Sequence, residues 1–289
     1  MKKIPFISSL LLLWTMATVA HAANLAADDA SDPAYSGGWG VGLNGGYGFG
    51  AWILVPPQPT NAMSSSHGFY IGSSTANADG WDDASINGLH GDLDIDTGAS
   101  SPAAWGMYAN TFLSAFAIRP FTGGPLSSGQ TFSVDFDNGY IQSGGEVSLG
   151  FLDADSNFVF RVYFTGGLTN YYSQDYFGIL DTGLDYGDEG LNLTVVMTSA
   201  TNYLATITRR DSSAAVFGGS MSGLPVAFGA VNQNAGEGTR YDFFINSMSI
   251  VPEPSVVSMI AIGLSGLAVR ILMRRKLVRH TDFYRVPTR

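Results

Sequence analysis

Each of two groups of aspartates is spaced so that the carboxylates within the group could bind one metal ion. Asp92, Asp94 and Asp96 alternate with apolar residues, so an extended strand would place all three side chains on one face. The second group consists of Asp181, Asp185 and Asp188. Carboxylate oxygens are preferred ligands of Ca²⁺, although neither group fits the EF-hand loop; the alternative is a pair of solvated acidic turns. Calcium is the one cofactor that the sequence suggests.

Aromatic residues beside amide and carboxylate groups form a second candidate site. Tyr171, Tyr172 and Tyr176 are close in sequence, and Trp81 precedes two aspartates in a loop-like segment. The tyrosine stretch also contains Asn170, Gln174, Asp175 and Phe177. Aromatic rings supply stacking faces, while amides and carboxylates supply hydrogen bonds, which is the composition of a carbohydrate subsite. The alternative is that these tyrosines close the edge of a β-sandwich and lie in its core.

Residues that commonly perform catalysis are sparse between positions 23 and 251. Glutamate occurs there only at Glu146, Glu189 and Glu237. These are far apart in sequence, whereas a glycosidase needs two carboxylates roughly 5–9.5 Å apart. The histidines of this region are His67 and His90, and no serine stands in a G-x-S-x-G motif. The chain has no cysteine, which excludes thiolate catalysis and cysteine-ligated metals. We therefore expect a protein without enzymatic activity.

The elements that must position these residues show a period of two. In residues 157–164 the apolar side chains are Phe158, Phe160, Val162 and Phe164, and Arg161 falls on the opposite face. The same alternation occurs in residues 131–136, 191–195 and 202–208. Runs of Gly, Asn, Asp and Ser separate these segments as turns do. The pattern predicts an all-β, antiparallel sandwich of the jelly-roll type.

The predicted sandwich occupies one domain, residues 23–250, with a compact core over about residues 51–250. Residues 36–50 are rich in glycine and carry Trp39, Tyr47 and Phe49. A flexible lead-in is one interpretation of this segment. The aromatic residues among the glycines favour a first pair of strands instead.

The N-terminus has the features of a secretory signal peptide. Lys2 and Lys3 precede an apolar stretch from residue 6 to residue 19, and Ala20-His21-Ala22 follows. Small residues in this spacing predict cleavage before Ala23. The signal peptide, residues 1–22, therefore predicts export by the general secretion machinery.

The C-terminus combines a short motif, an apolar segment and a basic cluster. The motif is Val251-Pro252-Glu253-Pro254-Ser255, and the basic cluster is Arg274, Arg275 and Lys276. Between them, residues 256–273 carry Arg270 as their only charge and would form about 27 Å of helix, close to the roughly 30 Å of a bilayer core. The basic residues predict that this end, with residues 277–289, stays in the cytoplasm.

This three-part tail resembles the PEP-CTERM sorting signal of Gram-negative bacteria. The resemblance implies processing by an exosortase, a membrane peptidase, and passage from the inner membrane to the cell surface or extracellular matrix. A single transmembrane anchor that is never cleaved is the alternative.

A second resemblance covers much of the predicted sandwich. The runs at residues 104–110, 129–139 and 234–246 are similar to the body of PEP-CTERM proteins with a concanavalin A-like jelly roll. Lectin-like sandwiches of that kind often bind polysaccharide, so the resemblance implies an extracellular polysaccharide as partner. This implication rests on analogy of fold alone.

Charge restricts the class of partner further. Residues 23–251 contain five arginines, no lysine and 22 of the 24 acidic residues, which gives a net charge near −17. Such a domain should be repelled by nucleic acid and by anionic lipid headgroups. The first hypothesis is an exported surface or matrix protein that binds or organises polysaccharide. The alternatives are a polysaccharide hydrolase or lyase that uses aspartates or tyrosines, and a purely structural matrix protein.

Overall fold

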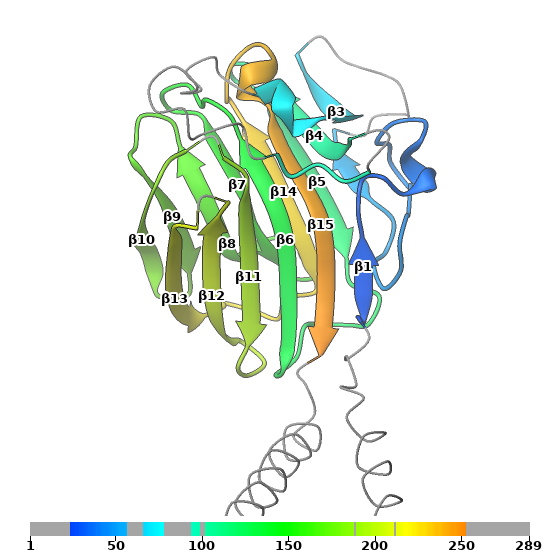
Figure 1. The fold of residues 1–289 in the computed structure, drawn as a ribbon. Helices are drawn as coiled ribbons and strands as arrows, with labels where there is room; N and C mark the ends of the chain where they lie inside the picture. The colour runs from blue at the N-terminus through cyan, green and yellow to red at the C-terminus, as the bar shows by residue number, and fades with distance from the viewer. Residues whose placement is uncertain are drawn as a thin grey trace, which may run out of the picture. The chain divides into compact units, whose positions relative to one another are not determined.

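Antiparallel strands form nearly all of the regular structure in the computed structural model, which describes residues 24–56, 66–77, 94–98, 102–187, 189–210 and 212–252. The sheet nearer the viewer in Figure 1, here the front sheet, contains in spatial order β13 (Ala214–Ser220), β12 (Asn202–Arg209), β11 (Leu191–Met197), β6 (Gln130–Asn138), β15 (Phe243–Pro252), β4 (Ala104–Ala109) and β3 (His67–Gly72). A short eighth strand, β1 (Ala26–Asp28), pairs with β15.

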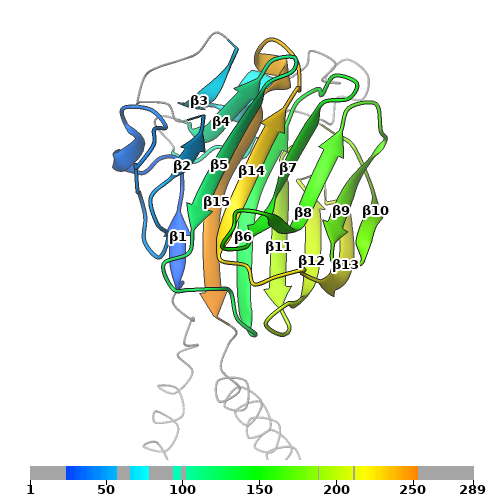
Figure 2. The ribbon, with the colours of Figure 1, turned by 180° about the vertical axis from the view of Figure 1, so that it is seen from behind.

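The second layer, here the back sheet, faces the viewer in Figure 2. It contains in order β10 (Gly178–Asp185), β9 (Asn170–Asp175), β8 (Phe158–Thr165), β7 (Glu146–Leu152), β14 (Ala227–Gln233), β5 (Ser114–Pro120) and β2 (Ile53–Val55). Three short 3-10 helices are η1 (Pro33–Tyr35), η2 (Ser74–Asn77) and η3 (Thr239–Tyr241). The prediction of an all-β protein built from antiparallel sheets is confirmed.

The inner faces of the two sheets pack into one core. Phe132 of β6 contacts Phe151 of β7 with ring centroids 5.1 Å apart, and it also stacks on Phe228 of β14 at 5.5 Å. All three side chains are fully buried. Contacts of this kind hold the layers together because each strand directs alternate apolar residues inward.

The predicted alternation holds along β8, with one exception. Phe160, Val162 and Phe164 are buried in the core, and Arg161 lies on the outer face. Phe158 was expected on the same side as Phe160, but a register shift between β7 and β8 turns it outward. It packs there against Leu152 in a small apolar cluster on the outer face of the back sheet. A bulge of this kind reverses the facing of every residue beyond it.

The glycine-rich segment before residue 51 belongs to the folded core, although it forms no strand pair. Trp39 and Phe49 are each 2% exposed, and Trp39 packs edge to face on Trp52 at 4.8 Å. Residues 36–50, all of which are described, contain isolated bridges instead of the expected strands. Buried side chains begin at Ala26, well before the predicted core boundary near residue 51.

A buried ion pair fastens this N-terminal segment to the back sheet. Arg119 of β5 donates to the Asp28 carboxylate at 2.5 Å, and both side chains are fully buried. The Tyr35 hydroxyl also donates to Asp28, at 2.5 Å, and accepts from the Trp52 indole at 3.2 Å. Burial raises the pKa of the Asp28 carboxyl to about 6, against the opposing effects of Tyr35 and Arg119. Above that pH the two charges compensate each other inside the protein.

Glycine allows the chain to turn tightly beside this ion pair. Gly46 has a φ of 61°, and a Cβ atom there would lie 2.0 Å from the carbonyl oxygen of Ala27. The carbonyl oxygen of the neighbouring Gly45 accepts a hydrogen bond from Arg119, and the Gly45 amide donates a hydrogen bond to the Tyr35 hydroxyl. Any larger residue at position 46 would force the two backbone segments apart.

One buried amide joins three segments on the outer face of the front sheet. Asn246 of β15 is fully buried; its Nδ2 donates to the carbonyls of Ile95 and Ala103, at 2.9 and 2.8 Å, and its Oδ1 accepts from Ala30 at 2.9 Å. Residues 94–98 therefore lie across β15, with Ile95 packed on Phe244.

The two ends of the described chain lie at the same end of the sandwich. Strand β1 runs antiparallel to β15 with Ala26 opposite Ile250, which brings Leu25 within hydrogen-bonding distance of Ile250. Strand β15 continues through Val251 and Pro252, which pair with Thr131 and Gln130 of β6. The first two residues of the predicted sorting motif thus end a strand.

The predicted signal peptide and the rest of the sorting signal lie outside the described residues, as do the basic cluster and residues 277–289. Within the described ranges no helix has the length and apolar character needed to cross a bilayer. The predicted membrane segment, residues 256–273, falls outside them.

We expect Arg119→Met to lower the free energy of unfolding by roughly 3–5 kcal/mol at pH 7.5, because it leaves the Asp28 carboxylate buried without its partner. The double variant Asp28→Asn/Arg119→Met should be more stable than Arg119→Met, since it removes both charges. Urea unfolding followed by circular dichroism measures both. Arg161→Met, which breaks a partly exposed pair, is the control and should cost no more than about 1 kcal/mol. A double variant less stable than Arg119→Met would contradict this account.

Candidate functional site

The outer face of the back sheet carries a pair of tyrosines on neighbouring strands. Tyr163 of β8 and Tyr172 of β9 lie directly opposite each other in the ladder. Their rings are stacked, with centroids 5.8 Å apart and planes inclined by 28°. The strands that carry them are adjacent in Figure 2. Because the inward residues of β8 and β9 fill the core, both side chains lie on the outer face of the sheet, where Tyr163 is 8% exposed and Tyr172 is partly exposed.

Hydrogen-bonding groups surround the tyrosine pair. The Arg161 guanidinium lies 4.6 Å from the centroid of the Tyr163 ring and donates through Nε to Gln174 at 2.8 Å. It also pairs with the carboxylate of Glu146 on β7. We call these five residues, Glu146, Arg161, Tyr163, Tyr172 and Gln174, the tyrosine platform. It spans three adjacent strands of one sheet.

The platform continues onto the edge strand. Asn170, at the start of β9, donates to the Asp181 carboxylate of β10 at 2.9 Å. Four strands at about 4.8 Å spacing cover about 14 Å across the sheet. Amide, carboxylate and guanidinium groups therefore line a strip of sheet wide enough for an oligomeric ligand.

Electrostatics keep the Tyr163 hydroxyl protonated. Burial raises the pKa of the Tyr163 hydroxyl above its ordinary value, while the positive charge of Arg161 opposes this shift. The phenol therefore stays protonated at neutral pH and can donate a hydrogen bond. Glu146 is held by Arg161, with both side chains about a quarter exposed. The arrangement can stack a ring and hydrogen-bond hydroxyl groups.

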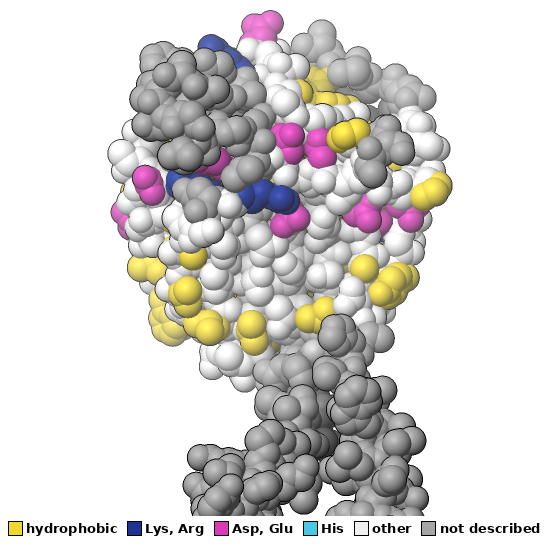
Figure 3. Space-filling view, in the orientation of Figure 1, with side chains coloured by type: hydrophobic (Ala, Val, Ile, Leu, Met, Phe, Trp, Pro, Cys, Tyr) yellow, Lys and Arg dark blue, Asp and Glu magenta, His cyan; other side chains and the backbone are white. Residues whose placement is uncertain are grey.

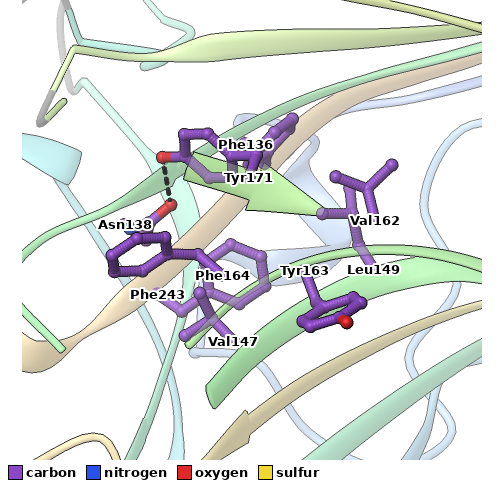
Figure 4. Close-up of a pocket in the computed structure, with 9 residues that line it drawn as sticks. All are labelled: Phe136, Asn138, Val147, Leu149, Val162, Tyr163, Phe164, Tyr171 and Phe243. Carbon is purple, nitrogen blue, oxygen red and sulfur yellow. Dashed lines mark hydrogen bonds between the residues drawn. The ribbon is translucent and has the colours of Figure 1, made fainter. Parts of the chain in front are cut away.

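Tyr171 must be corrected from a candidate sugar contact to a core residue. Its side chain is 1% exposed and points between the sheets. Its hydroxyl donates to Asn138 of β6 at 2.8 Å, as Figure 4 shows. The neighbouring apolar side chains leave no room there for a molecule the size of water. Burial raises the pKa of this hydroxyl well above its ordinary value.

The other predicted aromatic contacts are dispersed. Tyr176 is 68% exposed at the turn between β9 and β10, where it packs edge to face on Phe177 at 5.5 Å. This turn lies at the end of the sheet, beyond the platform. Trp81 lies outside the described residues. Of the four predicted carbohydrate contacts, Tyr172 is the one that the structure places on the platform.

The predicted calcium ligands are engaged in hydrogen bonds or fall outside the described residues. Asp94 accepts from Thr75 at 2.7 Å, and Asp96 accepts from the Ser74 amide at 2.8 Å, so both hold η2 in place. Asp92 and Asp188 lie outside the described residues. Asp185 is near Arg209 at 3.6 Å, and Asp181 is the partner of Asn170.

No three histidine or acidic side chains in the part of the chain that the structure describes come together as a metal site. Because two of the six predicted ligands fall outside that part, calcium binding remains a prediction.

The aspartates and the tyrosines do not share a groove. Asp94 and Asp96 lie over the front sheet, next to η2 and β15, whereas Tyr172 lies on the outer face of the back sheet. A polysaccharide-cleaving site built from both segments would need them on one face. His67 is in β3 of the front sheet, and His90 lies outside the described residues. The enzymatic alternative therefore loses the arrangement that would support it best.

A second carboxyl group with a shifted pKa lies on the outer face of the front sheet. Asp242, the residue between η3 and β15, is 5% exposed and accepts from the Tyr70 hydroxyl at 2.5 Å. Burial raises its pKa from 3.8 to about 7, and the Tyr70 hydrogen bond opposes this rise. The same contact raises the pKa of Tyr70, after the larger effect of burial. Asp242 and the tyrosine platform are on different sheets.

Three members of the platform, Glu146, Arg161 and Tyr163, were not predicted as site residues from the sequence. Tyr163 has the same parity as Arg161, so the period-two pattern already placed it on the outer face. Its position opposite Tyr172 depends on the pairing of β8 with β9. Glu146 is separated from Arg161 by a turn and most of two strands, and the sequence alone gives no sign of that contact.

Comparisons with known proteins give distant structural similarities. No protein-family model matches the sequence, and no curated protein matches it. A carbohydrate esterase from Shiga toxin-encoding bacteriophage phi24B aligns with a TM-score of 0.45 and 11% identity over 80% of this chain and 99% of its own. The Ca²⁺/Man3GlcNAc-bound exoplasmic/lumenal domain of VIP36 aligns at 0.37 and 12% identity, over 52% of this chain and 78% of its own.

A sialidase aligns at 0.38 and 11% identity, and this chain spans 15% of that protein's length. TM-scores this low assign the chain to none of these groups.

Asp242 predicts a specific pH dependence. Its carboxyl has a higher pKa in the folded protein than in the unfolded chain, so its contribution to stability is complete below about pH 3.8 and is lost as the pH rises through about 7. In the wild type this loss should lower the free energy of unfolding by at most about 4 kcal/mol between about pH 3.8 and about pH 7, and Asp242→Asn should abolish it. Urea unfolding at several pH values measures the slope.

Tyr70→Phe is the matched comparison for this prediction. It removes the hydrogen bond that opposes the rise in pKa of Asp242, so the loss of stability should shift to higher pH. Identical pH profiles for the wild type and Asp242→Asn would contradict the burial argument.

Proposed function

We propose that this protein binds polysaccharide without cleaving it, through the tyrosine platform of the back sheet. The observation that carries the proposal is the stacked pair Tyr163 and Tyr172, on the outer face of a sheet and bordered by Arg161, Gln174 and Glu146. Tyr163 is 8% exposed, so Tyr172 is the ring of the pair that a ligand can reach. An aromatic side chain at this position needs a reason, because a solvated sheet face is ordinarily polar.

The chemistry of the platform suits a sugar. A pyranose ring offers an apolar face of C–H groups for stacking on Tyr172 and a rim of hydroxyl groups for the surrounding polar side chains. These side chains already hydrogen-bond one another, so their orientation is fixed before a ligand arrives. Preorganised groups lose less conformational entropy on binding.

Charge favours a neutral glycan over an anionic one. The arginine of the platform is paired with Glu146, and residues 23–251 carry a net charge near −17 from five arginines and 22 acidic residues. A polyanion would meet a repulsive field over most of the surface. The ligand class that fits is a neutral polysaccharide.

The proposed setting is the cell surface or the extracellular matrix. The N-terminal signal peptide and the PEP-CTERM-like tail support export and processing by an exosortase, and neither segment lies within the described residues. A concanavalin A-like jelly roll is the finer fold type proposed. Its support is that strands distant in sequence are neighbours in both sheets, as with β11 beside β6 and β14 beside β7.

Polysaccharide binding is tested with Tyr172→Ala. We expect this change to weaken retention on the producing organism's own extracellular polysaccharide by roughly two- to tenfold, equivalent to about 0.5–1.5 kcal/mol of lost stacking. Affinity electrophoresis, with and without calcium, measures the effect. Tyr172→Phe keeps the ring and should bind nearly as well as the wild type.

Phe112→Ala is the control for nonspecific apolar contact, because Phe112 is 92% exposed on the turn between β4 and β5, away from the platform. Equal loss of retention in Phe112→Ala and Tyr172→Ala would contradict the assigned site. An assay for new reducing ends or unsaturated products separates binding from catalysis, and product release would replace the proposal with the enzymatic alternative.

A further inference from the structure

One end of the sandwich differs from the rest of the surface in its charge. We call this end the terminal pole. It consists of residues 24–25, the turns at residues 122–129, 153–157, 176–177, 198–201 and 221–226, and residues 251–252. It is the lower end of the molecule in Figures 1 and 2, where β15 ends and β1 begins.

Hydrogen bonds between neighbouring turns make the terminal pole one continuous surface. The amide of Tyr176 donates to Ser220 at 2.9 Å, which joins the β9–β10 turn to the end of β13. The Leu126 amide donates to Pro225 at 2.9 Å and links two further turns. At the other side Leu25 donates to Ile250 at 2.7 Å. The chain ends are therefore part of this surface.

The terminal pole exposes large apolar side chains. Phe177 is 76% exposed, Tyr176 68%, Leu224 48% and Leu25 47%. Exposed apolar residues also occur at the opposite pole, where Phe112 is 92% exposed. Exposure alone does not distinguish the two ends.

Charge does distinguish them. The terminal pole, all of whose residues are described, contains no basic residue, and the acidic residues of its turns are Asp153 and Asp155. The Asp153 carboxylate accepts hydrogen bonds from the backbone amides of Asp155 and Asn157, each at 2.9 Å. Asp175, next to the β9–β10 turn, accepts from Phe177 and Tyr203. In the face that Figure 3 shows, acidic and basic side chains lie in the upper and middle parts, whereas apolar side chains lie along the lower rim and also in the upper part.

The chain itself leads from this pole into an apolar segment. The structure describes the chain as far as Pro252, at the terminal pole, and an apolar segment begins at residue 256 and carries no charge as far as residue 269. Three residues therefore separate the terminal pole from a run that is apolar enough to enter a bilayer. Tyrosine, phenylalanine and leucine are residues that partition into the interface between headgroups and acyl chains, whereas carboxylates are costly there.

We propose that, while the C-terminal tail is still attached, the terminal pole rests on a lipid bilayer, with Phe177, Tyr176 and Leu224 in the headgroup region. This orientation would direct the charged, opposite pole away from the membrane and leave both outer sheet faces, including the tyrosine platform, open to the exterior. The proposal does not depend on what the platform binds. The lipid interface would cover the exposed apolar side chains of the terminal pole.

Single-cysteine labelling tests the proposal, because the chain has no cysteine of its own. Phe177→Cys and Leu224→Cys report on the terminal pole, and Phe112→Cys on the opposite pole. Each variant of the full chain is labelled with a nitroxide and reconstituted into phosphatidylcholine nanodiscs. Electron paramagnetic resonance then compares collisions with oxygen, which concentrates in lipid, and with a water-soluble nickel complex. Circular dichroism checks each fold, and the two labels at the terminal pole give independent readings.

We expect the ratio of oxygen to nickel collisions to be several-fold higher at positions 177 and 224 than at position 112. A membrane tether alone would hold the domain near the bilayer but leave both poles in contact with water. Equal ratios of oxygen to nickel collisions at positions 177 and 112 would therefore overturn the proposal. Protection at 177 accompanied by spin–spin broadening, which would indicate contact with a second copy, would also overturn it.

Discussion

Every strand of this sandwich must give one of its faces to the core, and the remaining faces are what the protein has available for function. Tyr171 and Tyr172 show the consequence within one dipeptide. Tyr171 is 1% exposed between the sheets and donates to Asn138, whereas Tyr172 stacks on Tyr163 outside. A shift of one residue in the register of β9 would exchange the two roles. The packing of the core therefore determines which aromatic residues can meet a ligand.

Two buried polar contacts hold neighbouring segments of the chain against the two sheets. The Arg119–Asp28 pair ties the N-terminal segment to β5, and Asn246 ties residues 94–98 and Ala30 to β15. Asn246 has partners for both atoms of its amide, whereas Oδ1 of Asp28 and Nε of Arg119 are buried without a hydrogen-bond partner, so the ion pair is only partly satisfied. Asn246 thereby holds an irregular segment over the outer face of the front sheet, whereas the outer face of the back sheet carries the tyrosine platform. This difference between the two sheets accounts for the proposed binding face.

The sequence predicts the faces of strands well and their partners poorly. Alternation in residues 157–164 places Arg161 outside and Val162 inside, as the structure has them, because the period of a strand is a local property. Phe158 departs from the pattern because a bulge depends on the pairing of β7 with β8. The same limit applies to the site. Tyr172 was predicted as a site residue from the composition of the segment around it. Its contact with Tyr163 and the ion pair between Arg161 and Glu146 depend on pairing between strands.

The central claim is that the outer face of the back sheet meets the polysaccharide, and the most direct measurement is the location of the bound glycan by nuclear magnetic resonance. Oligosaccharides cut from the producing organism's own extracellular polysaccharide would be titrated into isotope-labelled protein. The account predicts that the largest shifts fall on Arg161, Tyr163, Tyr172 and Gln174. Shifts centred on the outer face of the front sheet, where Asp135 of β6 pairs with Asn192 of β11, or no shifts at saturating ligand, would contradict it.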